Sequence, residues 1–123
     1  MTTTMGTIEA IKGRRSVRRY LADPVPREII EDIVDCGRLA PSARNDQPWE
    51  FVVVTDQMIR EEIAAAATYG KFIADAPVCV LAFARQTRRH TEDTCAAVEN
   101  MLIAAYAHGL GSCWIAGENT PYE

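Results

Sequence analysis

Two short polar segments carry the residue types that could bind a nucleotide-like ligand. Residues 14–20 read RRSVRRY and are densely cationic, which suits a phosphate group. Residues 41–49 read PSARNDQPW and are rich in amide and hydroxyl groups, which suits the polar edge of a heterocycle. We therefore expect a bound cofactor with these two segments at its two ends.

The cationic segment has the chemistry of a phosphate clamp. Alternate residues of an extended segment share a face, so Arg14, Ser16 and Arg18 would point the same way. The planar guanidinium forms paired hydrogen bonds with phosphate oxygens, and the serine adds a hydroxyl donor. The same residues also fit a solvated basic loop with no ligand, and both interpretations stay open from the residues alone.

The polar turn offers groups that both donate and accept hydrogen bonds. Asn45 and Gln47 carry such amides, which match a ring edge made of carbonyls and ring nitrogens. Pro41 and Pro48 restrict the backbone at both ends of the turn and would hold these amides in place. The alternative is an ordinary polar loop with Trp49 packed as an anchor in the core.

Composition limits the classes of protein that this chain could be. With 123 residues, 48% of them hydrophobic, it fits a single domain over residues 1–123. A net charge of −4 argues against nucleic-acid binding, which relies on a broad basic surface. No apolar run reaches the roughly 18 residues of a membrane span, so we expect no membrane partner and a cytoplasmic location.

The cysteines point to a reducing compartment and to no metal. The four cysteines are widely spaced and form no Cys-x-x-Cys pair, which disfavours a zinc site and a dithiol redox motif. Free thiols among apolar neighbours behave as small hydrophobic groups. We therefore expect neither metal ligands nor disulfides.

Hydrophobic periodicity predicts helices that alternate with strands. Helices are expected at 7–12, 26–40, 56–68, 72–75 and from 91 or 93 to 109, and buried strands at 50–55, 78–83 and 112–116. This order indicates an α/β or α+β fold of the three-layer type. The last helix is apolar around most of its circumference, so it should lie in the core or at a subunit interface.

The same segments resemble the flavin-dependent nitroreductase family. The similarity lies in residues 14–18, residues 41–49, the helix from Asp93 through Asn100, and the run GLGSCWI at 109–115, in the family's order and approximate spacing. It covers essentially the whole chain. The resemblance implies a nitroreductase-like α+β fold with a central mixed or antiparallel sheet flanked by helices. It also implies a homodimer with a flavin site at each end of the interface.

The resemblance further implies FMN as the cofactor and assigns residues to it. One group would bind its phosphate, ribityl chain and pyrimidine edge: Arg14, Arg15, Ser16 and Arg18. A second group would reach the flavin of the partner subunit: Pro41, Ser42, Ala43 and Asn45. Ala116 and Gly117 would lie against the isoalloxazine ring near N5.

The implied activity is an oxidoreductase reaction with NADH or NADPH as co-substrate. Hydride would pass to flavin N5 and then to an electron-poor acceptor such as a nitroaromatic or a quinone. Because the flavin carries the chemistry, no side chain need act as acid, base or nucleophile. Arg18 would stabilise the anionic reduced flavin. Two alternatives stay open: dehalogenation, flavin breakdown or ene-type reduction on the same scaffold, and a flavin-binding or dimerisation module without turnover.

The sequence departs from the family pattern at its end. Family members continue with a helix, a strand and a C-terminal segment that embraces the partner subunit, whereas this sequence stops at Glu123. We therefore expect the C-terminal part of the fold to be missing. The chain would be a fragment, a short member of the family, or one that needs a second polypeptide.

Overall fold

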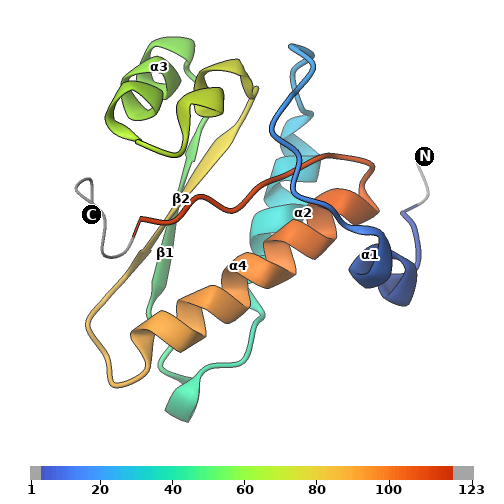
Figure 1. Ribbon diagram of the computed structural model, residues 1–123. Coiled ribbons are helices and arrows are strands. Elements are labelled where there is room, and N and C mark those ends of the chain that lie inside the picture. The colour runs from blue at the N-terminus through green and yellow to red at the C-terminus, as the bar shows by residue number, and fades with distance from the viewer. Residues whose placement is uncertain (1–3, 118–123) are drawn as a thin grey trace.

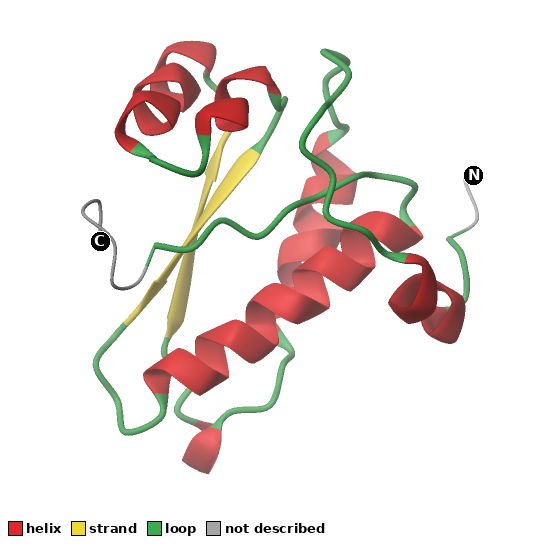
Figure 2. Cartoon of the chain, in the orientation of Figure 1, coloured by secondary structure: helices red, strands yellow, loops and turns green. Residues whose placement is uncertain are grey.

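The computed structural model describes residues 4–117 and contains a small sheet with α4 packed on it and with α3 at one end of the strands (Figures 1 and 2). Its elements are α1 (Thr7–Gly13), α2 (Arg27–Arg38), the 3₁₀ turn η1 (Ala43–Asn45), β1 (Trp49–Val54), α3 (Gln57–Ala66), the 3₁₀ turn η2 (Lys71–Asp75), β2 (Cys79–Ala84) and α4 (His90–Ala107). The predicted helices are confirmed to within a few residues. No helix in the described range is long and apolar enough to cross a membrane.

The main core lies where α2 crosses α4. Ile33 of α2 packs with Met101 and Ala105 of α4, and Phe51 and Val80 from the two strands pack against the same cluster. The apolar residues of α2 recur at helical spacing on one face, which drives this contact. A second cluster, made of Ala40, Trp49 and Ala97, fixes the start of β1 against α4. The long helix is therefore a core element, as its composition predicts.

The sheet has two antiparallel strands. Residues pair in register from Trp49 opposite Ala84 to Val54 opposite Cys79. The prediction of a buried strand at 50–55 is wrong for Val52 and Val53, which expose 47% and 40% of their surface, and Phe83 in the apolar run at 78–83 exposes 52%. Helix α4 packs against both strands, but within residues 4–117 these three side chains have no comparable cover.

The predicted third strand at 112–116 does not form among the described residues. Its backbone makes a single parallel bridge, between Ser112 and Ser16, in which the Val17 N–H donates to the Ser112 carbonyl at 2.9 Å. A strand forms when backbone hydrogen bonds to a neighbouring extended segment repeat over several residues. The Arg-rich segment beside residues 112–116 offers only this one bridge. The segment therefore runs as an extended loop beside the Arg-rich residues.

Chain reversal after α4 brings this loop to the Arg-rich segment. Gly109 has a φ of +82°, and its N–H donates to the Tyr106 carbonyl at 2.8 Å. The Leu110 N–H donates to the Ala105 carbonyl at 2.9 Å, which completes a Schellman cap. Glycine is suited to this left-handed position because it has no Cβ. The GLG run thus ends α4 and directs the following residues back across the molecule (Figure 1).

The contact between α2 and α4 predicts the effect of Gly37→Ala. An added Cβ would lie 2.7 Å from Met101 Cγ and 2.9 Å from its Sδ. Overpacking of this kind costs about 1–3 kcal/mol, only partly offset by the roughly 1 kcal/mol that alanine gains over glycine in a helix. We expect a lower free energy of unfolding, measured by urea titration with circular dichroism.

Gly6→Ala is the matched control for this substitution. An added Cβ at Gly6 meets no atom within 4 Å, and its φ is −65°. This variant should unfold at nearly the same urea concentration as the parent chain. Equal stability of the two variants would mean that α2 and α4 do not approach as closely as described.

Candidate functional site

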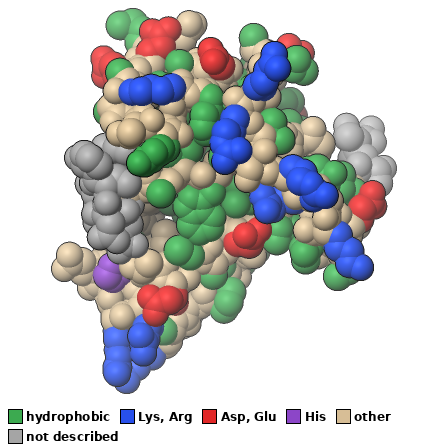
Figure 3. Space-filling view, viewed as in Figure 1, with side chains coloured by type: hydrophobic (Ala, Val, Ile, Leu, Met, Phe, Trp, Pro, Cys, Tyr) green, Lys and Arg blue, Asp and Glu red, His purple; other side chains and the backbone are tan. Residues whose placement is uncertain are grey.

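The Arg-rich segment and the segment that follows α4 lie side by side. The bridge between Ser16 and Ser112 joins them, and Gly111 sits directly against Val17. A Cβ at Gly111 would be 3.0 Å from the Val17 Cβ, so the close approach requires glycine. Figure 3 shows basic side chains over α1 and the segment after it, around a hydrophobic patch. The structure thus brings residues 14–18 and 111–115 together, as one half of the expected site.

The three arginines of this half differ in their surroundings. Arg14 is partly buried, and its Nε lies 3.7 Å from Glu99 Oε1 of α4. Arg15 folds back on α1, where Nη1 donates to the carbonyls of Lys12, Gly13 and Arg14 at 3.4, 3.3 and 3.0 Å. These bonds satisfy carbonyls at the helix end and already occupy the Arg15 guanidinium.

Arg18 is the most available cation of this half. Its side chain is exposed, and in the described part of the chain it makes no hydrogen bond and no ion pair. On the segment bridged to Ser16, the Ser112 hydroxyl is buried and has no hydrogen-bond partner among residues 4–117. Buried hydroxyls normally find a partner, so this group is an exception.

Tyr20 anchors the end of the Arg-rich segment and was missed by the sequence analysis. Its hydroxyl donates to the Val17 carbonyl, and its ring lies against Phe72 of η2 with centroids 6.1 Å apart. Burial raises the pKa of Tyr20 to about 12, and Cys113 adds to this shift. The position of Tyr20 directly after the cationic run is the one feature of the sequence that could have marked it as an anchor of this segment. Tyr20 thus connects the segment to η2, and Ile115 packs against the small core cluster of Ala64, Ala67 and Ile73, the last of which also lies in η2.

Ala116 and Gly117 extend from this packed region. They follow Ile115 in a loop near the end of the described residues, with Ala116 exposed and Gly117 partly buried. Both have interactions within the molecule. They therefore belong to the same half of the site as Ser112.

The polar turn adopts an unusual backbone. Arg44, Asn45 and Gln47 have φ values of +54°, +57° and +47°. Residues other than glycine pay an energetic cost in the left-handed region, and asparagine tolerates it best. Pro48 at the end of the turn is fully buried in the molecule, whereas Pro41 at its start is exposed to solvent.

Hydrogen bonds hold this turn in place. The Gln47 N–H donates to Ser42 Oγ at 3.0 Å, and the Ala43 N–H donates to Asp93 Oδ1 at 3.1 Å. Arg85 Nη2 donates to the carbonyls of Asp46 and Gln47 at 3.0 and 3.1 Å. Ser42, Ala43 and Asn45 are thus presented on a loop tied to the start of α4 and the end of β2.

The two halves lie at opposite ends of α4 in one chain (Figure 1). Ala43 bonds to Asp93 in the first turn, whereas Ser16 contacts Ser112 beyond the last residue, Ala107. At 1.5 Å per residue, Asp93 and Ala107 are about 21 Å apart along the helix. The structure therefore does not bring the two predicted groups together within a single chain.

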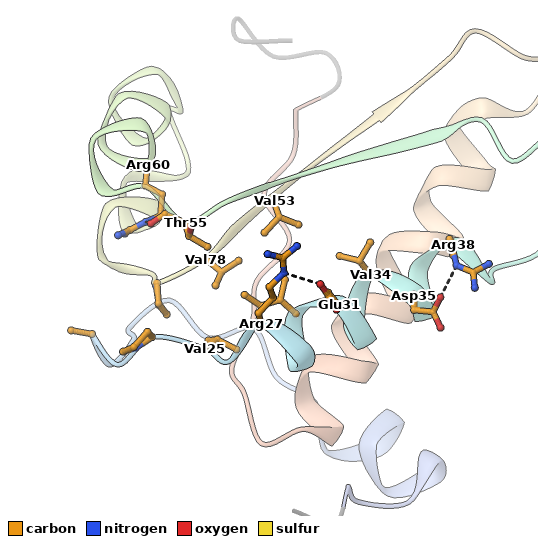
Figure 4. A pocket seen from close by; sticks show the side chains of 14 residues that line it. Val25, Arg27, Glu31, Val34, Asp35, Arg38, Val53, Thr55, Arg60 and Val78 are labelled. Atoms are coloured by element: carbon orange, nitrogen blue, oxygen red, sulfur yellow. Dashed lines mark hydrogen bonds and ion pairs between the residues drawn. The ribbon is translucent and has the colours of Figure 1, made fainter.

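A groove of about 840 Å³ lies elsewhere, between α2, the end of β1 and residues 22–25 (Figure 4). Its charges pair with one another: Arg27 Nε is 2.8 Å from Glu31 Oε1, and Arg38 Nε is 2.6 Å from Asp35 Oδ1. Arg60 donates to backbone carbonyls of Thr55 and of η2. None of the predicted site residues lines this groove, and its arginines already have partners, Arg27 and Arg38 in ion pairs and Arg60 in bonds to carbonyls.

Known proteins match both the sequence and the fold. The Nitroreductase family model matches residues 11–70 and 65–121. A protein of Methanothermobacter thermautotrophicus described as an NADH dehydrogenase/NAD(P)H nitroreductase is 36% identical over 115 residues, which are 89% of this chain and 60% of that protein. The chain thus spans less than two thirds of this relative.

A solved structure and a second relative extend the comparison. The structure of a Desulfovibrio desulfuricans nitroreductase in complex with FMN has a TM-score of 0.83 and 35% identity, with 93% of this chain and 70% of that chain covered. An iodotyrosine deiodinase of Haliscomenobacter hydrossis is 44% identical over 59 residues, which are 48% of this chain and 27% of that protein. The family match spans nearly the whole chain and the backbone has the nitroreductase-like fold, so the chain belongs to the Nitroreductase family.

Proposed function

We propose that the chain is the FMN-binding part of an oxidoreductase that transfers hydride from NADH or NADPH to electron-poor acceptors such as nitroaromatics and quinones. The main support is one observation: the exposed, unpaired Arg18 lies on the segment that bridges to Ser112. The names of the relatives and the FMN complex of the Desulfovibrio desulfuricans structure support the cofactor.

The residues of the Arg-rich half fit the anionic end of FMN. Arg14 and Glu99 are 3.7 Å apart at a partly exposed site, and such pairs contribute only about 0–1 kcal/mol. A phosphate dianion can therefore replace Glu99 as the partner of Arg14, because it forms stronger, paired hydrogen bonds with the guanidinium group. The exposed Ser16 hydroxyl would bind phosphate or ribityl oxygens. Arg15 is the weaker candidate, because it already caps α1.

The polar turn is proposed to serve the site of a second copy of the chain. Pro41, Ser42, Ala43 and Asn45 lie at the far end of α4 from Arg18, so they contact the same flavin only across a homodimer interface. A twofold axis perpendicular to α4 and near its middle would place each end of α4 in one subunit near the opposite end of α4 in the other. Ala116 and Gly117 are proposed to lie beside the ring in the subunit that provides Arg18.

Bound FMN would supply hydride transfer, and the chain would supply binding and electrostatics. Arg18 would offset the negative charge that the flavin pyrimidine gains on reduction. Partner residues at 41–45 would cover the ring and limit the access of water. No described side chain is assigned a role as acid, base or nucleophile. A cytoplasmic location remains part of the proposal.

Reductive dehalogenation is the second candidate function. It is favoured by the iodotyrosine deiodinase match, in which the local identity of 44% is higher than in the longer alignment. A flavin-binding module without turnover is the third possibility. The identity of the acceptor separates the first two functions, and the absence of turnover identifies the third.

Absorption spectra of the purified chain test the proposed function. We expect flavin absorption that bleaches anaerobically on addition of NADH or NADPH and returns with a nitroaromatic or a quinone. Return only with a halogenated phenol would favour dehalogenation. Flavin that stays oxidised would favour the binding module, and a chain that takes up no FMN would refute the proposal.

Arg18→Ala should weaken FMN binding. Loss of a charge-assisted hydrogen bond costs about 1.5–3 kcal/mol, so the dissociation constant should rise roughly 10- to 100-fold. Quenching of flavin fluorescence in a titration measures it. Arg19→Ala is the matched control, because Arg19 is adjacent, also exposed and carries the same charge, but is not among the predicted site residues. Equal losses in both variants would indicate a nonspecific effect of charge.

Mixing two variants tests the sharing of sites between subunits. Arg18→Ala and Asn45→Ala chains should each bind FMN poorly as homodimers. In a mixed dimer one site carries both substitutions and the other carries neither, so an equimolar mixture with random exchange should recover about a quarter of the sites. If both groups act within one chain, every site keeps one substitution and nothing is recovered.

A further inference from the structure

The strained turn at residues 41–47 needs support from outside itself. Three non-glycine residues with positive φ would relax readily in an isolated peptide. Bonds within the turn, such as that from the Asn45 N–H to the Ser42 carbonyl at 3.1 Å, set its local shape. They do not fix its position relative to the core.

Within the described residues, Asp93 provides one of two side-chain links to the core, and Arg85 provides the other through the Asp46 and Gln47 carbonyls. Asp93 lies in the first turn of α4 with only 6% of its surface exposed, and its Oδ1 accepts the Ala43 N–H at 3.1 Å. The positive end of the helix dipole favours a carboxylate at this place. Burial of an ionised group is costly unless it is well paired, so a carboxylate here requires a specific role.

The surroundings of the second carboxylate oxygen of Asp93 indicate which contact this role depends on. Asp93 Oδ2 is buried and has no hydrogen-bond partner among residues 4–117. The bond to Ala43 is therefore the contact through which this side chain acts on its surroundings. An amide at this position could keep that bond, since its carbonyl oxygen also accepts a hydrogen bond and no donor to Oδ2 would be lost.

We propose that Asp93 is a positioning residue of the flavin site, which sets the polar turn at the place where it meets the flavin of the partner subunit. The part of this inference that concerns the flavin rests on the proposed function. The tether itself is a property of the single chain. Asp93 acts through Ala43 and does not touch the cofactor.

Asp93→Ala tests the tether directly. Without FMN, the amides of Ala43 and Asp46 should exchange hydrogen for deuterium faster than in the parent chain. With FMN, the dissociation constant should rise about tenfold, because the turn must be ordered on binding. Asp93→Asn should restore both readouts, since its side-chain oxygen can accept the Ala43 N–H.

Asn100→Ala is the matched control on the same helix. Asn100 Nδ2 donates to the Cys36 carbonyl at 3.0 Å, so this variant loses a buried tether of α4 to α2 instead of to the turn. It should lower the melting temperature without changing exchange in the turn or FMN affinity. A similar loss of affinity in Asn100→Ala and Asp93→Ala would overturn the proposal.

The remaining outcomes are equally decisive. Unchanged exchange in Asp93→Ala would overturn the tether. Impaired binding by Asp93→Asn would also overturn it, and this variant serves if the alanine variant fails to fold. If the parent chain binds no FMN, the proposed function fails, while hydrogen exchange still decides whether Asp93 holds the turn.

Discussion

Packing of α4 against α2 and the sheet is the interaction on which the rest of the structure depends. Met101 and Ala105 of α4 contact Ile33, Ala97 packs with Trp49, and the strands rest on the same helix. The start of α4 holds the polar turn through Asp93, and its glycine cap directs the chain back to Ser16. Helix α4 thus positions both halves of the candidate site and sets the distance between them.

Most helices could be predicted from the sequence because their signals are local. Asp56, the first residue of the range predicted for α3, caps that helix with Oδ2 accepting the Ile59 N–H at 3.0 Å, and Gly109 ends α4. From the family resemblance, residues 14–18 and the pair Ala116 and Gly117 could be predicted to serve one flavin. The contact between the Arg-rich segment and the segment after α4, through Val17 and Gly111, needed the three-dimensional structure, because sequence spacing carries no information on which loops meet.

The errors have a common physical cause. Residues 112–116 have the composition of a strand, but a strand forms only where a regular partner is available. Val52 and Phe83 look like core residues by type, and their exposure depends on what covers the sheet. Asp93 and Tyr20 were overlooked as positioning residues because their partners, Ala43 and Phe72, are distant in sequence. Long-range contacts therefore account for what sequence patterns missed.

The sparsely covered sheet has a consequence for the behaviour of the protein at high concentration. Within the described residues β1 pairs only with β2, which leaves backbone donors and acceptors along the outer edge of each strand. Exposed Val52, Val53 and Phe83 add apolar surface beside them. Unpaired edges with apolar flanks recruit strands from other chains and promote aggregation. Solubility of this chain should therefore depend on what shields β1 and β2.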